Sequence, residues 1–429
     1  MASASQVVRS AWGRRCLIGA LGLAVRLTYV LAAAPRRLPI GDPLGYHLQA
    51  NALAAGHGFV SPFLQAFSGR SVPTAAEPPL FTIVLAMGSL LGAHTVLAHQ
   101  IVGALIGTGT VVLVALVGET CAGRPCGYWA GLLAAVYPPL WVSDGGLGAE
   151  SLFALLTAAG VLAGSRFGRA PTVRTAAVLG AVVGLATLTR VEGALLGPLL
   201  VLPVVVRRAA GSPLRRLTAV GGAAVVALAV LAPWTIRNLV TFERPVLLST
   251  GEGTLAGANC DPAYRGPKAG LWIITCVPPP PPGDESVANA FWRQAGTTYA
   301  RHHARRLPAV VVLRVARTWQ LYGPVQDAMV DRDDGRPRWA NLVGLVAYAV
   351  VAATAFGGAV VLVRRRSPFG VLMAPMVLAT VTAATIWGAV RFRAPAEISL
   401  VVLAAVALER VTGRLGHPSL TPVGPGRPV

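Results

Sequence analysis

The stretch CLIGALGLAVRLTYVLAAAPRRLPIGDPLGY, residues 16–46, joins a long apolar segment to a short polar loop that contains an acid. Residues 16–34 suit a retained membrane-spanning helix, which needs about 20 apolar residues. Arg26 lies in the middle of this segment, and burying it there requires a partner or a water-filled cavity. Asp42 follows in the loop. A carboxylate at the rim of a membrane bundle has a desolvation cost, so Asp42 is a candidate functional residue.

The composition of the chain indicates a polytopic membrane protein. Hydrophobic residues make up 54% of the 429 residues and charged residues only 13%, which is too apolar for a typical soluble protein. The net charge of +20 does not indicate nucleic-acid binding, because the arginines gather in short clusters beside apolar segments. Aromatic residues are not interleaved with these clusters, as a single-strand binder would need.

Apolar segments recur along the chain and predict an all-α fold with about 10 transmembrane helices. The candidate spans are residues 16–34, 97–117, 128–145, 150–165, 174–190, 191–206, 217–236, 341–363, 369–388 and 395–410. Segment 78–93 is also apolar, but it is short and begins with Pro78-Pro79. We expect this segment to be an interfacial or re-entrant helix, because counting it as a span places one arginine cluster on the wrong side of the membrane.

Arginine clusters set the expected orientation in the membrane. They lie at residues 9–15, 166–174, 207–216 and 364–366, and all of them should face the cytoplasm. Loop 35–96 and segment 237–340 are then outside, and the chain is expected in the plasma (inner) membrane. Of the 17 acids, only Glu119 and Glu409 fall on the cytoplasmic side.

This orientation divides the chain into four parts. They are a seven-span module with a catalytic first external loop (1–236, loop 35–96), an external cap (237–340), three further spans (341–411) and a disordered cytoplasmic tail (412–429). Cys260 and Cys276 lie in the cap on the oxidising side, so we expect them to form a disulfide. Short helices are expected in the cap near 286–303 and 305–322.

Three acids lie next to the ends of apolar helices. Asp42 can serve as a general base, because apolar walls raise the pKa of a carboxylate that accepts a proton from a hydroxyl. Asp before Pro43 is also a common helix entry, so an N-cap role stays open. Glu77 either caps its helix or is a second carboxylate in the same cavity that binds a sugar hydroxyl or a metal. Glu150, at the start of an outer helix, is either a helix cap or a functional carboxylate.

Several arginines lie at the outer ends of the predicted spans. Arg190 either neutralises Glu192 or points inward at an anionic head group, since guanidinium suits phosphate. Arg237, Arg391 and Arg393 either anchor the interface or have a function. The sequence has no phosphate loop, dinucleotide fingerprint or nucleophile elbow, so any sugar donor would arrive through the membrane.

These features together resemble the GT-C superfamily of polyprenyl-phosphate-sugar glycosyltransferases. The likeness is greatest to glycosyltransferase family 39, the aminoarabinose lipid A transferases and the RgtA/B/C/D-like proteins. The matching motifs, in chain order, are Gly41-Asp42 with Tyr46, Glu77-Pro78-Pro79, Tyr137-Pro138 leading to Glu150-Ser151, Leu188-Thr189-Arg190, Pro233-Trp234 with Arg237-Asn238, and Arg391-Phe392-Arg393-Ala394-Pro395. Each motif is short, and their order and sidedness make the likeness specific.

The resemblance implies a mechanism. A polyprenyl-phosphate sugar enters from the bilayer, and arginines hold its phosphate. Asp42 deprotonates a hydroxyl of a glycan, lipid or protein acceptor in the cell envelope, which attacks the anomeric carbon with inversion. Substrate-binding roles are implied for the other motif residues, namely Tyr46, Glu77, Glu150, Arg190, Arg237, Asn238, Arg391 and Arg393.

The chain also departs from this family. Relatives often carry an acidic pair in the first loop, and Pro43 replaces the second acid here. Pro78 stands where many relatives have lysine. Metal dependence is therefore doubtful, and no metal ligand or other cofactor is assigned. A transporter or flippase of a lipid-linked substrate, or an inactive relative, is the alternative; Asp42→Asn would abolish transfer and need not affect transport.

Overall fold

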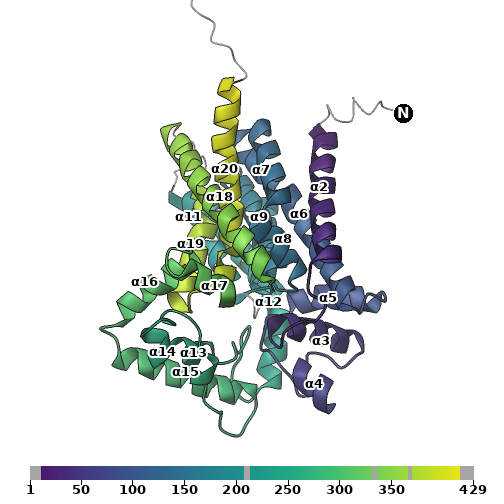
Figure 1. Cartoon of the computed structure of the whole chain (residues 1–429), viewed down its shortest axis with the longest axis vertical. Coiled ribbons are helices and arrows are strands. Elements are labelled where there is room, and N and C mark those ends of the chain that lie inside the picture. The colour runs from purple at the N-terminus through teal and green to yellow at the C-terminus, as the bar shows by residue number, and fades with distance from the viewer. Residues whose placement is uncertain (1–10, 207–212, 331–335, 366–369, 416–429) are drawn as a thin grey trace, which may run out of the picture.

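The computed structural model describes residues 11–206, 213–330, 336–365 and 370–415, and they form an all-α membrane protein. A bundle of long helices rises from a layer of shorter ones (Figure 1). This layer contains residues 35–95 and 242–330, and we call its side of the bundle the capped end. The predicted tail beyond Leu415 and parts of three arginine clusters lie outside the described residues.

The helices of the bundle correspond to the ten predicted spans. They are α2 (Ala11–Ala32), α6 (Val96–Ala122), α7 (Arg124–Val136) with α8 (Pro138–Gly145), α9 (Glu150–Arg169), α10 (Val173–Thr187), η1 (Val191–Leu195) with α11 (Leu196–Val206), α12 (Pro213–Thr241), α18 (Arg338–Arg364), α19 (Gly370–Thr385) and α20 (Ala394–Leu415). Within the described residues, α2, α6, α9, α12 and α18 are long and apolar enough to cross a membrane. Among the others, α10, η1 with α11 and α19 are shorter apolar helices.

One predicted span was wrong, because it is not a single continuous helix. Residues 128–145 form two helices, because Tyr137 leaves the helical region at φ −75° and ψ 112°. Pro138 follows it, and a residue before proline is disfavoured in the helical conformation. The proline then begins α8, where its missing N–H costs nothing.

Segment 78–93 forms α5 (Leu80–Leu90), a helix of 11 residues. Its length of about 16 Å, at 1.5 Å per residue, is too short to cross a bilayer. Together with α3 (Asp42–Ala54) and α4 (Pro62–Ser68), it lies at the capped end (Figure 1). This placement agrees with the expected interfacial helix.

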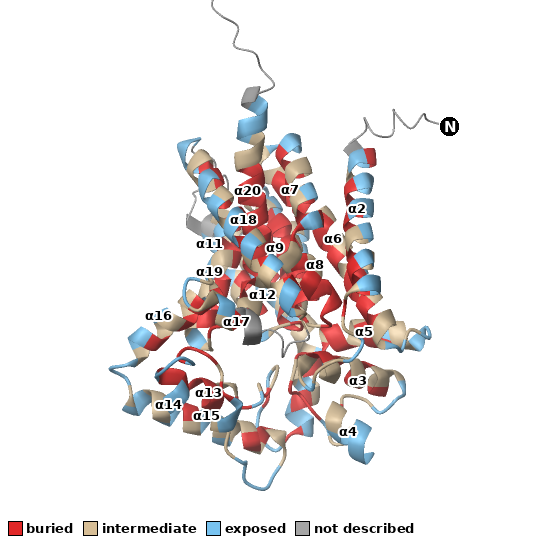
Figure 2. Cartoon of the chain, viewed as in Figure 1, coloured by how far each residue is buried: buried red, intermediate tan, exposed pale blue. Residues whose placement is uncertain are grey.

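Burial separates the central helices from the peripheral ones. Buried residues gather in the middle of the bundle, on α9 and α20 among others (Figure 2). In contrast, only 11% of the apolar window of α12 is buried, against 67% of the window of α9. The exposed apolar face of α12 includes Val225 and Leu228, and such a surface suits contact with lipid.

The cap consists of short helices around a small apolar core. They are α13 (Thr254–Ala258), α14 (Asp261–Tyr264), η2 (Ile274–Cys276), α15 (Glu285–His302), α16 (Leu307–Thr318) and α17 (Pro324–Val330). Cys260 and Cys276 form a disulfide, the pairing expected from the sequence. Glu285, at the start of α15, accepts hydrogen bonds from Thr74 Oγ1 (2.5 Å), from the backbone N–H of Ala75 and from Thr250. The cap is thereby attached to the loop before α5.

Candidate active site

A cavity of about 320 Å³ lies at the capped end, between the bundle and the cap. Among the described residues, five parts of the chain line it: the first loop with the start of α3, the corner between α10 and η1, residues 249–255, α15, and the connection from α19 to η3 (Val390–Arg393). Its charged lining residues are Asp42, Glu77, Arg190, Glu192, Arg293 and Arg391. The acids of the first loop therefore share one space with arginines from distant parts of the chain.

Asp42 is the first residue of α3, and Gly41 takes the N-cap position with a φ of 154° that favours glycine. The N-cap reading of Asp42 was therefore wrong. Its Oδ2 instead accepts a hydrogen bond of 2.6 Å from Nη1 of Arg391. Burial raises the pKa of Asp42, but Arg391 and then Arg190 lower it, and the net pKa lies below the usual value. The expectation of a raised pKa was also wrong, because the charges of Arg391 and Arg190 and the hydrogen bonds to the carboxylate together outweigh burial, which is the largest single effect.

Glu77 has the opposite electrostatic environment. Burial, and next the nearby carboxylate of Asp42, raise the pKa of Glu77 to about 8. The hydroxyl of Tyr46 donates to Oε2 of Glu77 across 3.4 Å, and Tyr46 packs edge-on against Phe81 of α5. Glu77 is therefore protonated near neutral pH, while Asp42 is ionised.

Arg190 pairs with Glu192, as one of the two sequence readings expected. It donates from Nε to Glu192 (2.6 Å) and from Nη1 to Glu150 at the start of α9 (2.7 Å). It also lines the cavity with Asp42 and Arg391. A guanidinium held by two carboxylates has a fixed position, so Arg190 presents a set geometry to the cavity.

Aromatic rings lie beside the two arginines. The ring of Phe392 lies 5.5 Å from the guanidinium of Arg190 and 5.7 Å from that of Arg391. Trp387 lies 5.7 Å from Arg391 and contacts Phe392 edge-on. Trp292 from the cap also lines the cavity, so the charged residues face aromatic surfaces.

Arg237 and Asn238, for which the resemblance implies substrate binding, do not line the large cavity. Arg237 donates to the backbone oxygens of Thr74 (2.9 Å) and Phe59 (3.0 Å) and lies over the ring of Trp234. Asn238 is buried and accepts a hydrogen bond of 2.9 Å from Arg237. These residues support the first loop and are not brought to the cavity.

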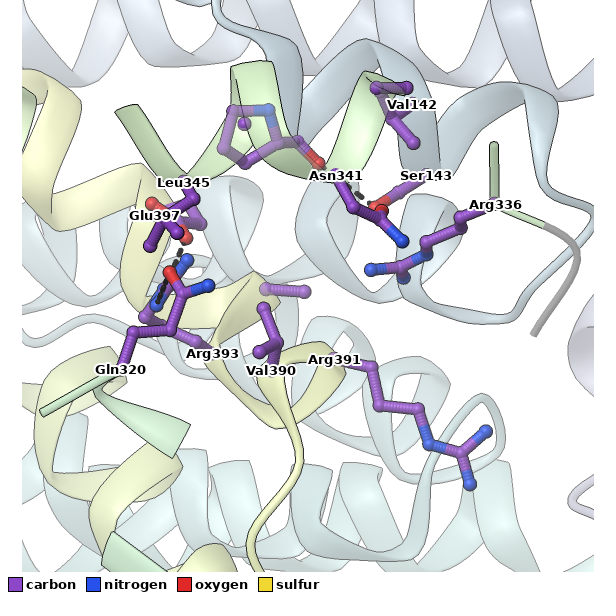
Figure 3. A pocket seen from close by; sticks show the side chains of 14 residues that line it. Val142, Ser143, Gln320, Arg336, Asn341, Leu345, Val390, Arg391, Arg393 and Glu397 are labelled. Atoms are coloured by element: carbon purple, nitrogen blue, oxygen red, sulfur yellow. Dashed lines mark hydrogen bonds and ion pairs between the residues drawn. The ribbon is translucent and has the colours of Figure 1, made fainter. Parts of the chain in front are cut away.

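Arg393 does not line the large cavity. It is buried, pairs with Glu397 at 2.5 Å and stacks on Tyr348. Glu397 also accepts a hydrogen bond of 2.7 Å from Tyr137. Arg393 lines a second cavity of about 40 Å³ among α8, α18 and η3, where Arg391 extends away from the Arg393–Glu397 pair (Figure 3).

Sequence reasoning missed several residues that line these cavities. Trp292, Asn289 and Trp387 line the large one, and Arg336 lines the small one. Trp387 precedes the Arg391 motif by four residues, so its proximity to that motif was the available signal. The cap residues carry no such signal, because their place depends on tertiary structure.

A family model described as dolichyl-phosphate-mannose-protein mannosyltransferase matches residues 76–236. This range includes Glu77, Glu150 and Arg190, and it excludes Asp42 and Arg391. No curated protein matches the chain.

Two solved structures share the fold. The oligosaccharyltransferase of Archaeoglobus fulgidus, tethered with an acceptor peptide containing the NVT sequon, matches with a TM-score of 0.59 and 13% identity, over 96% of this chain and 51% of that one. AglB from the same organism, in complex with an inhibitory peptide and a dolichol-phosphate, matches with a TM-score of 0.56 and 14% identity, over 94% and 50%. This chain thus spans about half the length of those proteins. It has the GT-C fold that the resemblance implies.

A third structure, ArnT from Cupriavidus metallidurans bound to undecaprenyl phosphate, matches with a TM-score of 0.45 and 19% identity, over 94% of this chain and 79% of that one.

Proposed function

We propose that this protein is an inverting membrane glycosyltransferase that moves a monosaccharide from a polyprenyl-phosphate donor to a cell-envelope acceptor. The supporting observation is the cavity at the capped end, where Asp42 lies beside Arg391 and near Arg190 in a GT-C fold. The matching family is that of dolichyl-phosphate-mannose-protein mannosyltransferase, and AglB was solved in complex with a dolichol-phosphate. The capped end is proposed to face the outside of the inner membrane.

The proposed reaction is a single displacement. The acceptor hydroxyl transfers its proton to the Asp42 carboxylate while its oxygen attacks the anomeric carbon. The bond from that carbon to the phosphate oxygen breaks, and the electron pair leaves with polyprenyl phosphate. Arg391 and Arg190 stabilise the negative charge that develops on the phosphate. Because phosphate is a good leaving group, one base is enough, unlike the carboxylate pair of most glycoside hydrolases.

The opposed pKa shifts support separate roles for the two carboxyl groups. A pair of acids with pKa values pushed apart divides naturally into a proton acceptor and a proton-bearing donor. Asp42 is ionised at neutral pH and can accept the proton. Glu77, with a pKa of about 8, is protonated and can donate a hydrogen bond to a substrate oxygen.

The pH dependence of transfer should report on Glu77. Its neutral form is lost as the pH rises through about 8, so the wild-type rate should fall on that alkaline side. Glu77→Gln keeps a neutral donor at every pH, and we expect it to remove the alkaline fall while retaining transfer within about tenfold at pH 7. An unchanged alkaline fall in the variant would assign it to another group.

The positive charge in the proposed mechanism comes from arginine. Arg391 already neutralises Asp42, so we propose that transfer needs no resident divalent metal. Addition of a chelator to the transfer assay tests this point, and full loss of activity that added magnesium or manganese restores would contradict it.

The deciding experiment is transfer by the purified full-length protein in lipid vesicles. Polyprenyl-phosphate mannose and arabinose, labelled in the sugar, are supplied with a cell-envelope extract as the source of acceptor. We expect the label to leave the lipid and an equal amount of polyprenyl phosphate to be formed. Label that crosses the vesicle membrane while still attached to lipid would instead show a flippase. No release from any donor would indicate an inactive relative.

A further inference from the structure

The ion pair between Asp42 and Arg391 is more exposed than the fully buried ion pairs of the bundle. The side chains of Arg391 and Asp42 are 16% and 35% exposed. The corresponding values are 0% and 5% for Arg26 and Asp144, and 1% and 4% for Arg393 and Glu397. A pair that is open to a cavity can exchange partners, because water and solutes reach both of its charges.

Arg391 also occupies a position between cavities. It lines the large cavity, the small cavity of Figure 3, and a third space that it shares with Asp42, Glu150 and Arg336. From η3 its side chain extends away from the Arg393–Glu397 pair (Figure 3). An anion that enters the large cavity therefore meets the guanidinium that Asp42 holds.

Pairing with Asp42 and binding of the donor phosphate both require the guanidinium of Arg391. A guanidinium binds phosphate in preferred two-point geometry, and it binds a carboxylate in the same way. While Arg391 is paired with Asp42, the carboxylate is a weakened base, because a neighbouring cation favours its ionised form. If a phosphate takes over the guanidinium, Asp42 loses that cation and becomes a stronger proton acceptor.

We propose that Arg391 is a shared counter-ion, which Asp42 holds in the resting protein and which the phosphate of the lipid-linked donor takes over on binding. This inference rests on the proposed function. Its consequence is a binding order, since the base is released only when the donor is in place. An acceptor hydroxyl, or water, is then not deprotonated at an empty site.

The competition makes an unusual binding prediction. Binding of undecaprenyl phosphate to the purified full-length protein in nanodiscs is measured for the wild type, Asp42→Asn, Arg391→Gln and the double variant. Asp42→Asn removes the competitor and should bind the lipid about tenfold more tightly, a change of 1.4 kcal/mol. Arg391→Gln should bind about tenfold more weakly. In the double variant the gain from Asp42→Asn should shrink below twofold, since the contested guanidinium is gone.

A matched control separates this exchange from general charge effects. Asp261 pairs with Arg265 at 3.5 Å on the cap surface, so Asp261→Asn makes the same chemical change away from the cavity and should leave binding unchanged. If Asp42→Asn still tightens lipid binding in the double variant, the gain reflects the overall electrostatic field and the proposal is overturned. The proposal is also overturned if Asp42→Asn does not tighten binding at all. If the wild type binds undecaprenyl phosphate but Asp42→Asn brings no gain in affinity, the proposed function still stands. If none of the proteins binds the lipid, both the proposed function and the counter-ion proposal are overturned.

Discussion

Replacing Asp42 by asparagine is expected to lower the rate of sugar transfer by about 10²- to 10⁴-fold, the usual contribution of a general base. Asparagine has nearly the same shape as aspartate but cannot accept the acceptor's proton. The variant should fold normally, because Gly41 and not Asp42 is the N-cap of α3. It should also still bind the lipid phosphate, so the loss is in turnover.

The measurement is transfer of labelled sugar in vesicles at saturating donor, with protein amount and melting temperature recorded for each variant. Asp261→Asn again serves as the control and should keep wild-type activity. Asp42→Glu should retain part of the rate, because it keeps a carboxylate at a shifted position. If Asp42→Asn transfers sugar within about fivefold of the wild type, a threshold far below the general-base contribution, Asp42 is not the base.

Much of the bundle could be predicted from the sequence, because each long helix needs a long apolar segment. The same reasoning predicted a short helix in segment 78–93, and α5 has 11 residues. It failed at residues 128–145, where hydropathy is continuous and the break comes from backbone sterics at Tyr137-Pro138. A count based on apolar length alone does not register such a break.

The candidate site was predictable in its residue types and only partly in its geometry. Asp42 and Arg391 are 349 residues apart and meet only through the tertiary fold. Arg237, Arg391 and Arg393 all follow apolar spans. However, Arg237 supports the first loop, Arg391 faces the large cavity and Arg393 is paired inside the bundle. The lowered pKa of Asp42 and the raised pKa of Glu77 depend on these distances, so composition and local motifs carry no information on them.

The largest effect on stability is expected from the buried ion pair between Arg26 and Asp144. Arg26 is fully buried in α2, and its Nε donates to Asp144 Oδ2 of α8 at 2.6 Å. This pairing supplies the partner that a mid-span arginine requires. Asp144→Ala would leave the guanidinium as an uncompensated buried charge, so we expect a loss of about 3–5 kcal/mol in the free energy of unfolding. The melting temperature in detergent and the amount of protein in membranes would both fall.

The double variant distinguishes lost pairing from lost packing. Arg26→Met together with Asp144→Leu removes both charges and keeps apolar volume, and such replacements of buried pairs are often neutral or stabilising. We therefore expect the double variant to recover most of the stability that Asp144→Ala loses. The surroundings are tight, since a Cβ at Gly107 of α6 would lie 1.9 Å from Asp144 Oδ2. Gly107→Ala should consequently destabilise the wild type. A stable Asp144→Ala variant, or a double variant no better than the single one, would show that the pair is not what holds α2 against α8.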